Sequence, residues 1–531
     1  MNKNIYYILG LLLIFSCNQN PKKFKSKEDF IETYFSDVKK ENTAHAYTTF
    51  LKEFPNNKYS EETKILRSSL DSIEILISTF LGNETRNYYG NKAPDNLKVN
   101  WKFYLGEGLS PAYNTQKIWK GAGWTGQPLL VKEKGELYII QGAFDYSLRK
   151  LKAKTGELVW EYKFDDILKG TGSIWVNNNA ENIEDRYIII QGSRKGWDKN
   201  KDSLYCTSLR AVSYITGKEK WRMNSVATDS YTRDVDASAL IINDTAYIPL
   251  ENGLFTIFDP DYKNVKELDG MLQPNIFKQL QYYNQADIEA HGDDLVPEAS
   301  PTLFDNKIYT PSGTGWVYGY NMKKMENDWE YYIGADLNGS LPLTDDSCLL
   351  VAIEKQYIDG RGGVLKLDPR KSPENSVVWF FPTENFKWLH WEGGLVGSVA
   401  INDNYITENE QHIAIFIDVA GYLYLIDHTQ TEPNQLVLAP NNIDKFPTPK
   451  LLAKEKIVGT IATPIIVDDK IIAPTDKGLF LYQIVIDEQK NVSLKLLDKT
   501  EDISIDATPI AWNGKIYIAS LDGYLYCLGQ D

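Results

Sequence analysis

Aromatic residues gather in two short stretches of the chain, YNTQKIWKGAGWTGQP and FKWLHWEGG. Together these stretches contain Tyr113, Trp119, Trp124, Trp388, His390, Trp391 and Glu392. Tryptophan and tyrosine offer flat apolar surface with one polar hydrogen, which suits sugar rings and peptide side chains. The two stretches therefore predict a binding surface for protein or glycan. The alternative is that these tryptophans pack between structural units.

The sequence carries no motif of a known catalytic centre. It has no GxSxG, HExxH or P-loop pattern, no adjacent cysteines and no haem-attachment motif. The five histidines show no metal-ligand spacing: His45, His291, His390, His412 and His428. Beyond Cys17, three widely spaced cysteines form no disulfide or zinc pattern. We therefore expect a binding protein and not an enzyme.

Composition limits the kind of partner. The 531 residues are 43% hydrophobic and 24% charged, and the formal net charge is −15. An acidic chain without clustered lysine and arginine is a poor match to phosphate backbones, which argues against nucleic acid. The length is ample for a large core.

The N-terminus predicts a lipid anchor. Residues 1–16 hold Lys3 and an apolar run too short to span a bilayer, which is typical of a signal peptide. The run ends in IFSC, which resembles the lipobox of bacterial lipoproteins and makes Cys17 the acylated residue. The alternative is an ordinary secretory signal. Asn18 in the tether 17–25, and the absence of an acidic run after it, imply the periplasmic face of the outer membrane.

Residues 26–85 have the apolar spacing of helices. Pro55 ends one predicted helix, and Ser60 opens the next. AYTTFLKEFPNNKYSEETK resembles one helix pair of tetratricopeptide-like repeats, and a helical hairpin without array function is the alternative. We expect a short helical segment over 26–85.

From residue 98 onward the chain is β-rich and repetitive. A small residue, usually followed by a hydroxyl residue and often proline, leads into an apolar strand at eight stations: 126–128, 172–174, 237–239, 299–301, 339–341, 397–399, 462–464 and 507–509. Hairpin turns and Gly-aromatic strands follow most of them, as in NGKIYIASLDGYLYCLG. Several units then close on tryptophan, strictly as TGELVW and TGKEKW.

This order of stations resembles the PQQ-like β-propeller repeat. The resemblance covers residues 98–531 and implies an all-β, eight-bladed propeller. The last blade supplies only three strands, so we expect residues 98–106, with Trp101, to complete it and close the ring. We expect residues 261–296 to form an insertion loop or helical excursion.

The resemblance also implies a candidate ligand site. In this fold the residue before each station lies where the innermost strand enters the central channel. Those positions are Thr125, Thr171, Asp236, Glu298, Asn338, Val396, Ile461 and Asp506. The polar members Asp236, Glu298, Asn338 and Asp506 could hold Ca²⁺ or a cationic ligand; the alternative is solvated polar residues.

The overall plan is similar to outer-membrane assembly lipoproteins of the BamB type. That similarity implies a membrane-anchored envelope protein whose propeller is a scaffold for other envelope proteins, in outer-membrane protein assembly. Two alternatives stay open, a PQQ- and Ca²⁺-dependent quinoprotein dehydrogenase and a glycan-binding lipoprotein. The dehydrogenases typically carry a vicinal cysteine pair, which this chain lacks, so we expect no PQQ cofactor. Fold likeness alone does not decide between these functions.

Overall fold

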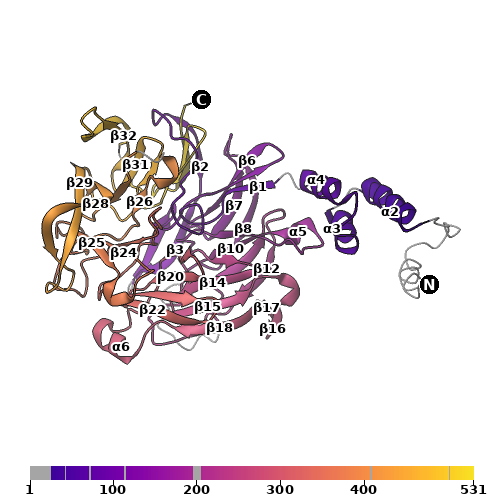
Figure 1. Ribbon diagram of the computed structural model, residues 1–531, viewed down its shortest axis with the longest axis horizontal. Helices are drawn as coiled ribbons and strands as arrows, with labels where there is room; N and C mark the ends of the chain where they lie inside the picture. Colours follow the sequence, from indigo (N-terminus) through magenta and orange to yellow (C-terminus); the bar gives the residue numbers. More distant parts are fainter. Residues whose placement is uncertain are drawn as a thin grey trace. The chain divides into compact units, whose positions relative to one another are not determined.

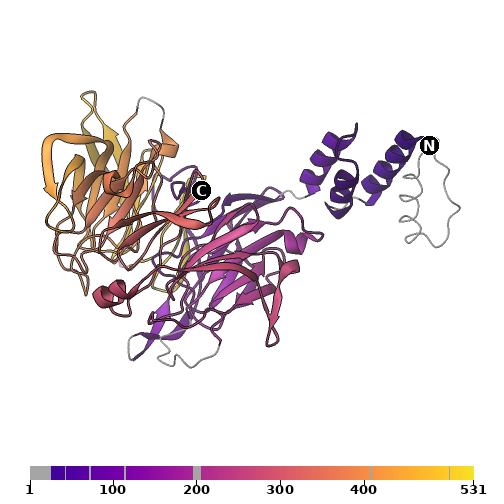
Figure 2. The same ribbon diagram turned by 60° about the horizontal axis from the view of Figure 1, so that its bottom comes forward.

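The computed structural model describes residues 26–41, 44–70, 73–112, 115–194, 205–406, 410–501 and 503–530. These residues form two compact units that divide between residues 72 and 73. The first unit is helical and the second is made almost entirely of β-strands (Figures 1 and 2).

The helical unit contains α2 (Lys27–Glu41), α3 (Ala44–Glu53) and α4 (Ser60–Leu70). Its core is aromatic, and its buried members are Ile31, Phe35, Val38, Ala46, Tyr47 and Phe50. Asn57 and Ser60 hydrogen-bond to the backbone between α3 and α4, which fixes the turn that Pro55 begins. The predicted helices are therefore present, with α2 as an additional one.

The β-rich unit is an eight-bladed propeller, and its first four blades follow one another along the chain. Blade 1 consists of β5 (Leu129–Glu133), β6 (Glu136–Gly142), β7 (Ser147–Lys152) and β8 (Leu158–Lys163). Blade 2 consists of β9 (Ser173–Val176), β10 (Tyr187–Gly192), β11 (Leu209–Ser213) and β12 (Glu219–Met223), with the short helix α5 (Ile183–Arg186). Blade 3 consists of β13 (Leu240–Ile242), β14 (Thr245–Leu250), β15 (Leu254–Asp259) and β18 (Asn275–Gln281). Blade 4 consists of β19 (Thr302–Phe304), β20 (Lys307–Pro311), β21 (Trp316–Asn321) and β22 (Glu326–Tyr332).

The second half of the ring is less regular. Blade 5 has three strands, β23 (Leu349–Ile353), β24 (Gly363–Leu367) and β25 (Val377–Pro382). Blade 6 consists of β26 (Ala400–Ile401), β27 (Ile413–Ile417), β28 (Tyr422–Leu438) and β29 (Lys445–Lys456). Blade 7 consists of β30 (Ile465–Val467), β31 (Lys470–Thr475), β32 (Gly478–Ile486) and β33 (Val492–Lys499). Blade 8 consists of β34 (Ile510–Trp512), β35 (Lys515–Ala519), β36 (Tyr524–Gly529) and β2 (Val99–Tyr104).

The ring closes through β2, which pairs antiparallel with β36 so that Trp101 lies opposite Cys527. The yellow C-terminal strand accordingly lies beside the purple β2 (Figure 1). The pairing covers the strand edge that an open ring would expose. After β2, the chain forms a separate hairpin of β3 (Glu107–Ala112) and β4 (Thr115–Lys120) before it enters blade 1.

Two boundaries differ from the sequence prediction. Residues 73–85 are not helical, because β1 (Ile73–Ile77) pairs with β5 and belongs to the propeller. Its alternating isoleucines form a strand once β5 offers a free edge, so tertiary pairing overrides the local pattern. Residues 261–296 are only partly an insertion, because β18 is the outer strand of blade 3.

The true excursions within 261–296 are small. They are the 3₁₀ turn η2 (Tyr262–Asn264), the hairpin of β16 (Lys266–Leu268) and β17 (Met271–Gln273), and the helix α6 (Gln285–His291). Asn284 caps α6 in a reciprocal capping box with Asp287. Within the stretch that was expected to leave the ring, α6 is the only α-helix and η2 is a single 3₁₀ turn.

Tryptophans of the outer strands join neighbouring blades. The indole N–H of Trp101, Trp160 and Trp221 donates to a backbone carbonyl of the next blade at 3.0, 2.9 and 2.9 Å. The glycine of the TG pair explains the rest of the motif. Gly156 has φ +73°, and a Cβ there would lie 2.7 Å from the Trp101 ring. Glycine therefore provides both the left-handed turn and room for the preceding blade's tryptophan.

The station hydroxyls form a belt of blade-to-blade hydrogen bonds. The N–H of Ser238 donates to Ser300 Oγ at 2.9 Å, and the N–H of Ser300 donates to Ser340 Oγ at 3.0 Å. The same bond links Ser340 to Ser398 at 2.9 Å and Ser398 to Thr463 at 2.8 Å. The stations of blades 3 to 6 thus pair a buried backbone N–H with a hydroxyl of the next blade, which explains why a serine or threonine recurs there.

Residues 78–91, which we call the channel segment, cross the centre of the ring. Ser78 accepts a hydrogen bond from Ile174 in blade 2 at 2.8 Å, and Tyr89 Oη accepts one from Ile401 in blade 6 at 3.0 Å. Glu84 accepts from Leu303 in blade 4, at 2.9 Å. Blades 2 and 6 lie opposite each other in an eight-membered ring, so a segment that contacts both must pass through the channel.

Arg86 anchors the channel segment. Its guanidinium is wholly buried and donates to the carbonyl of Pro301 in blade 4 at 2.9 and 2.7 Å. It also donates to Phe80 O and Thr79 Oγ1, both at 2.8 Å. Burial lowers the pKa of Arg86 to about 9. Hydrogen bonds to neutral oxygens thus replace its hydration, and the residue ties the segment to the far side of the ring.

Candidate binding site at the channel mouth

Three carboxylates from blades 3 and 4 converge beside the hydroxyl belt. Asp236 precedes the blade 3 station, Glu251 follows β14, and Glu298 precedes the blade 4 station. Oxygens of all three lie within 4.8 Å of one another. Lys169 forms an ion pair with this group: its Nζ lies 2.5 Å from Asp236 Oδ2. Among the described residues, the three acids therefore have Lys169 as their ion-pair partner.

A second acidic group from blade 5 adjoins the first. Asn338 Nδ2 donates to Asp336 Oδ2 at 3.0 Å and to Glu354 Oε2 at 3.3 Å. Asp294, which follows α6, contributes negative charge to this group and to Glu298. The predicted mouth residues Asp236, Glu298 and Asn338 are therefore brought into one electrostatic unit, which we call the acidic half.

Burial and mutual repulsion perturb these carboxyl groups. Burial raises the pKa of Glu298 to about 7 and that of Glu354 to about 8. The pKa values of Glu251 and Asp336 rise well above their usual range, through burial first and neighbouring carboxylates second. Burial alone would lower the pKa of Lys169, but Asp236 and the other acids raise it well above its usual value.

Several oxygens of the acidic half have no hydrogen-bond partner among the described residues. They are Glu251 Oε1, Asp336 Oδ1 and Asn338 Oδ1, and all three side chains are buried. A buried acceptor without a donor costs about 1–3 kcal/mol. Oxygens left in this way are suited to a cation, because Ca²⁺ takes several carboxylate and amide oxygens at once.

The other side of the mouth is apolar. Trp124, Val396 and Val419 form a buried cluster, against which Trp388, Trp391 and Ile461 pack. The rings of Trp388 and Trp391 stack at 5.5 Å with 11° between their planes. The two aromatic stretches of the sequence thus meet in space, together with the apolar mouth positions of blades 6 and 7. We call this cluster the aromatic half.

The remaining rim residues lie differently. Trp119 donates its indole N–H to Ser110 O at 3.0 Å within the β3–β4 hairpin and packs edge-on against Phe144. His390 and Glu392 are exposed, and the His390 ring lies 3.8 Å from that of Trp391. Tyr113 lies outside the described residues, as does Cys17.

Asp506 stands apart from the acidic half. Burial raises its pKa to about 6, and the charges that it senses are those of Asp476 and Lys117. Thr171 belongs to the belt, because its hydroxyl donates to Thr125 O at 2.6 Å and accepts from Gln127 N–H at 2.6 Å. The predicted set of mouth residues is therefore divided between two environments.

Sequence reasoning missed Glu251, Glu354 and Lys169. Glu251 directly follows β14, the second strand of blade 3, and Glu354 directly follows β23, the first strand of the three-stranded blade 5. The same repeat position holds Asp418 in blade 6. Comparing the residue at this position in all the repeats would have found both glutamates. Lys169 lies in an irregular loop, so no repeat position in the sequence indicates it.

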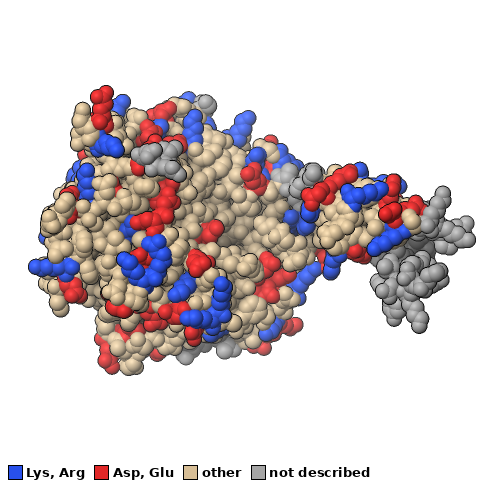
Figure 3. All heavy atoms as spheres, in the orientation of Figure 1, with Lys and Arg blue, Asp and Glu red and all other residues tan. Residues whose placement is uncertain are grey.

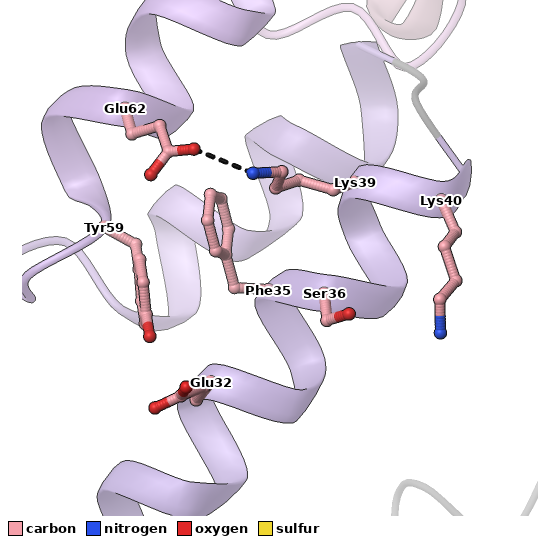
Figure 4. A pocket seen from close by; sticks show the side chains of 7 residues that line it. All are labelled: Glu32, Phe35, Ser36, Lys39, Lys40, Tyr59 and Glu62. Atoms are coloured by element: carbon pink, nitrogen blue, oxygen red, sulfur yellow. Dashed lines mark hydrogen bonds and ion pairs between the residues drawn. The ribbon is translucent and has the colours of Figure 1, made fainter.

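A shallow pocket of about 420 Å³ lies on the helical unit. Its lining residues are Glu32, Phe35, Ser36, Lys39, Lys40, Tyr59 and Glu62 (Figure 4). Phe35 stacks on Tyr59 at 4.4 Å, and Lys39 Nζ pairs with Glu62 Oε1 at 2.8 Å. These charged groups already satisfy one another, so the pocket offers less for recognition than the mouth does.

The residues of the mouth do not fit PQQ. This quinone bears three carboxylates, whereas the mouth presents Asp236, Glu251 and Glu298 with Lys169 as their cation. The cysteines Cys206, Cys348 and Cys527 are buried in separate blades and are all free. Like charges held close together repel, so the acidic half disfavours a polyanionic cofactor. A divalent cation fits the same oxygens.

Fold and repeat pattern together define a PQQ-like eight-bladed β-propeller. The solved structures that it resembles include BamB from Moraxella catarrhalis (13% identity, TM-score 0.48, covering 82% of this chain and 98% of that one). A europium-containing methanol dehydrogenase is also similar (11% identity, TM-score 0.52, covering 86% and 98%). So is the quinohemoprotein alcohol dehydrogenase from Comamonas testosteroni (13% identity, TM-score 0.49, covering 86% and 81%).

These likenesses concern the fold and leave the function open, because binding proteins and enzymes share this architecture. No protein-family model and no curated sequence matches the chain. No helix in the described part of the chain is long and apolar enough to cross a membrane.

Proposed function

We propose that this chain is a lipid-anchored envelope protein whose propeller is a non-catalytic scaffold that binds a cationic group at its channel mouth. The observation that carries the proposal is that residues at one repeat position around the ring belong to an acidic half in blades 3 to 5 and to an aromatic half in blades 6 and 7. Asp236, Glu251 and Glu298 supply charge, and Trp124 with Trp388 supplies apolar surface. A partner that presents a cation beside an apolar group matches both halves.

Two sources of the cation fit this chemistry. Ca²⁺ would be held by the carboxylates of Asp236, Glu251 and Glu298, since oxygen ligands are those it prefers. A lysine or arginine of a protein partner would pair with the same acids and place its backbone against the tryptophans. A Ca²⁺ titration followed by a titration with a lysine-rich peptide distinguishes them. If Ca²⁺ occupies the acidic half, it should weaken binding of the peptide; if Ca²⁺ does not bind there, the peptide should bind equally well with and without it.

The membrane attachment rests on the N-terminal sequence. Acylation of Cys17 would hold the protein at the outer membrane, on its periplasmic face, with envelope proteins as partners and outer-membrane protein assembly as the process served. Cys17→Ser should move the protein to the soluble periplasmic fraction or leave its precursor uncleaved. A mutant that loses its signal and stays membrane-bound contradicts the anchor.

A glycan partner has one observation in its favour, the stacked pair of Trp388 and Trp391. Flat indole faces are common in sugar sites. Gentle-detergent purification from the envelope, with identification of what remains bound, tests the alternatives. An envelope protein that co-purifies with the wild type and is lost in Glu298→Gln supports the scaffold function. A bound glycan that is lost in Trp388→Ala contradicts it and supports a glycan-binding function.

A further inference from the structure

Asp403, His412 and His428 of blade 6 are well separated in the sequence but lie together in the structure. Asp403 lies in the 3₁₀ turn η4 (Asp403–Tyr405), His412 precedes β27, and His428 lies on β28. Asp403 Oδ1 is 2.8 Å from His412 Nδ1 and 2.9 Å from His428 Nε2. The histidines show no ligand spacing in the sequence, but consecutive strands of one blade bring His412 and His428 together with Asp403.

The carboxylate at the centre of this group is wholly buried. The side chain of Asp403 has 0% exposure, as does that of His428, whereas His412 is 27% exposed. Apart from the two imidazoles, Asp403 accepts the backbone N–H of Asp345 at its Oδ2, at 2.9 Å. In the described part of the chain no lysine or arginine forms an ion pair with Asp403. A buried anion needs a cation close by.

We propose that Asp403, His412 and His428 form a divalent transition-metal site of the Zn²⁺ class. Two imidazole nitrogens and a carboxylate oxygen are the donor set that Zn²⁺ favours. Ligands of a tetrahedral zinc ion at 2.0–2.1 Å stand about 3.3 Å apart. The 2.8 and 2.9 Å separations thus need only a few tenths of an ångström of expansion once a metal replaces the two shared protons.

The exposed edge of His412 provides an entry path and room for a fourth ligand. Asp345 is exposed and its carboxyl group senses Asp403, His412 and His428. Its side chain or a water molecule would complete the tetrahedron. This site offers two imidazole nitrogens and one carboxylate oxygen, whereas the mouth offers oxygens. The two sites should therefore prefer different metals, Zn²⁺ here and Ca²⁺ at the mouth.

The site adjoins the residues that hold the channel segment. In the same turn, Asn404 Nδ2 donates to Asn87 O at 2.8 Å, and Tyr405 Oη accepts the N–H of Tyr89 at 2.8 Å. A metal at Asp403 would fix η4 and, through it, the channel segment. The role of the metal is therefore structural, a clamp between blade 6 and the segment that crosses the ring.

The test is metal binding by the chelator-treated full chain. Zn²⁺ should bind with one equivalent at these residues and raise the melting temperature, and Co²⁺ should give the visible absorption of a tetrahedral nitrogen–oxygen site. His412→Ala should weaken binding by about 100-fold or more and abolish the Co²⁺ band. His390→Ala, an exposed histidine elsewhere, is the matched control and should change neither.

Asp403→Asn provides a second variant that keeps the side-chain shape, in case His412→Ala destabilises the blade. It should fold, as judged by circular dichroism, and lose the Co²⁺ band. Hydrogen exchange of residues 85–91 should slow on Zn²⁺ addition in the wild type and not in Asp403→Asn. Zn²⁺ binding that is equal in wild type, His412→Ala and Asp403→Asn, or no tetrahedral Co²⁺ band in the wild type, would overturn the proposal.

Discussion

The two halves of the channel mouth occupy the same repeat position and differ in chemistry. Blades 3 and 4 place Asp236 and Glu298 before their stations, whereas blades 6 and 7 place Val396 and Ile461 there. The stations that follow are all members of the hydroxyl belt, as donors or acceptors of its blade-to-blade hydrogen bonds. The repeat therefore fixes the scaffold, and the residue just outside it is free to carry function.

The charged side chains of the mouth differ from those on the surface. On the face drawn in Figure 3, acidic and basic side chains are interspersed over the surface. The acids of the mouth differ because Asp236 and Glu251 are buried, so water does not screen them.

Removing charge from the acidic half should have the largest effect. Asp236→Asn combined with Glu298→Gln should abolish the rise in melting temperature on Ca²⁺ addition, because two of the three carboxylates that would hold the ion lose their charge. Thermal denaturation with and without Ca²⁺ measures this. Glu392→Gln, an exposed carboxylate on the rim, is the control. An undiminished Ca²⁺ response in the double variant places the ion elsewhere.

The apo protein should lose stability as pH rises. The folded-state pKa values of Glu298 and Glu354, about 7 and about 8, exceed the ordinary value, so the folded state holds protons that the unfolded chain releases. Stability is therefore full below about pH 4.5 for these groups and falls up to about pH 8, by about 1.4 kcal/mol for each unit by which a folded-state pKa exceeds its ordinary value. Denaturant unfolding across this range measures it. A flat profile for the wild type, or an equal slope in Glu298→Gln, contradicts the assignment.

Truncating the aromatic half should lower stability and leave the cation response alone. Trp388→Ala removes a half-buried ring that packs on Trp124 and Trp391, at a cost of about 2 kcal/mol. The Ca²⁺-dependent shift in melting temperature should stay at its wild-type value. Leu389→Ala, an exposed neighbour, controls for loop disruption. A lost Ca²⁺ response in Trp388→Ala would mean that the halves are coupled.

Neutralising Asp506 should have the smallest effect. This residue is a predicted mouth acid but senses Asp476 and Lys117, not the acidic half. Asp506→Asn should raise stability at pH 8, because the folded-state pKa of Asp506 exceeds its ordinary value, and should keep the full Ca²⁺ response. Isothermal titration with Ca²⁺ checks the second point, and a weakened affinity would place Asp506 in the site.

The parts of the molecule that sequence predicted are those in which a residue type has one backbone role. The glycine at the position of Gly156 and the hydroxyl residue at the position of Ser300 recur in several repeats, because few other residue types can replace them. This recurrence made the repeats recognisable in the sequence. The channel segment gave no such signal. It lacks regular secondary structure over most of its length, and its partners, such as Pro301 for Arg86, lie over two hundred residues away.

The candidate site was predictable to the same limited extent. Asp236 and Glu298 precede stations, so counting found them, whereas Glu251 approaches from a second strand and Asp403 meets His412 only after blade 6 has folded. Side-chain convergence between strands depends on register and twist, which one sequence does not display.

Titrating Ca²⁺ and PQQ into the same metal-free protein shows whether the mouth binds a cation without quinone chemistry. We predict that Ca²⁺ binds and raises the melting temperature through Asp236, Glu251 and Glu298, and that PQQ gives neither binding heat nor dye-linked oxidation of alcohols or sugars. Tight PQQ binding with Ca²⁺-dependent turnover would contradict the account and make the protein a quinoprotein enzyme.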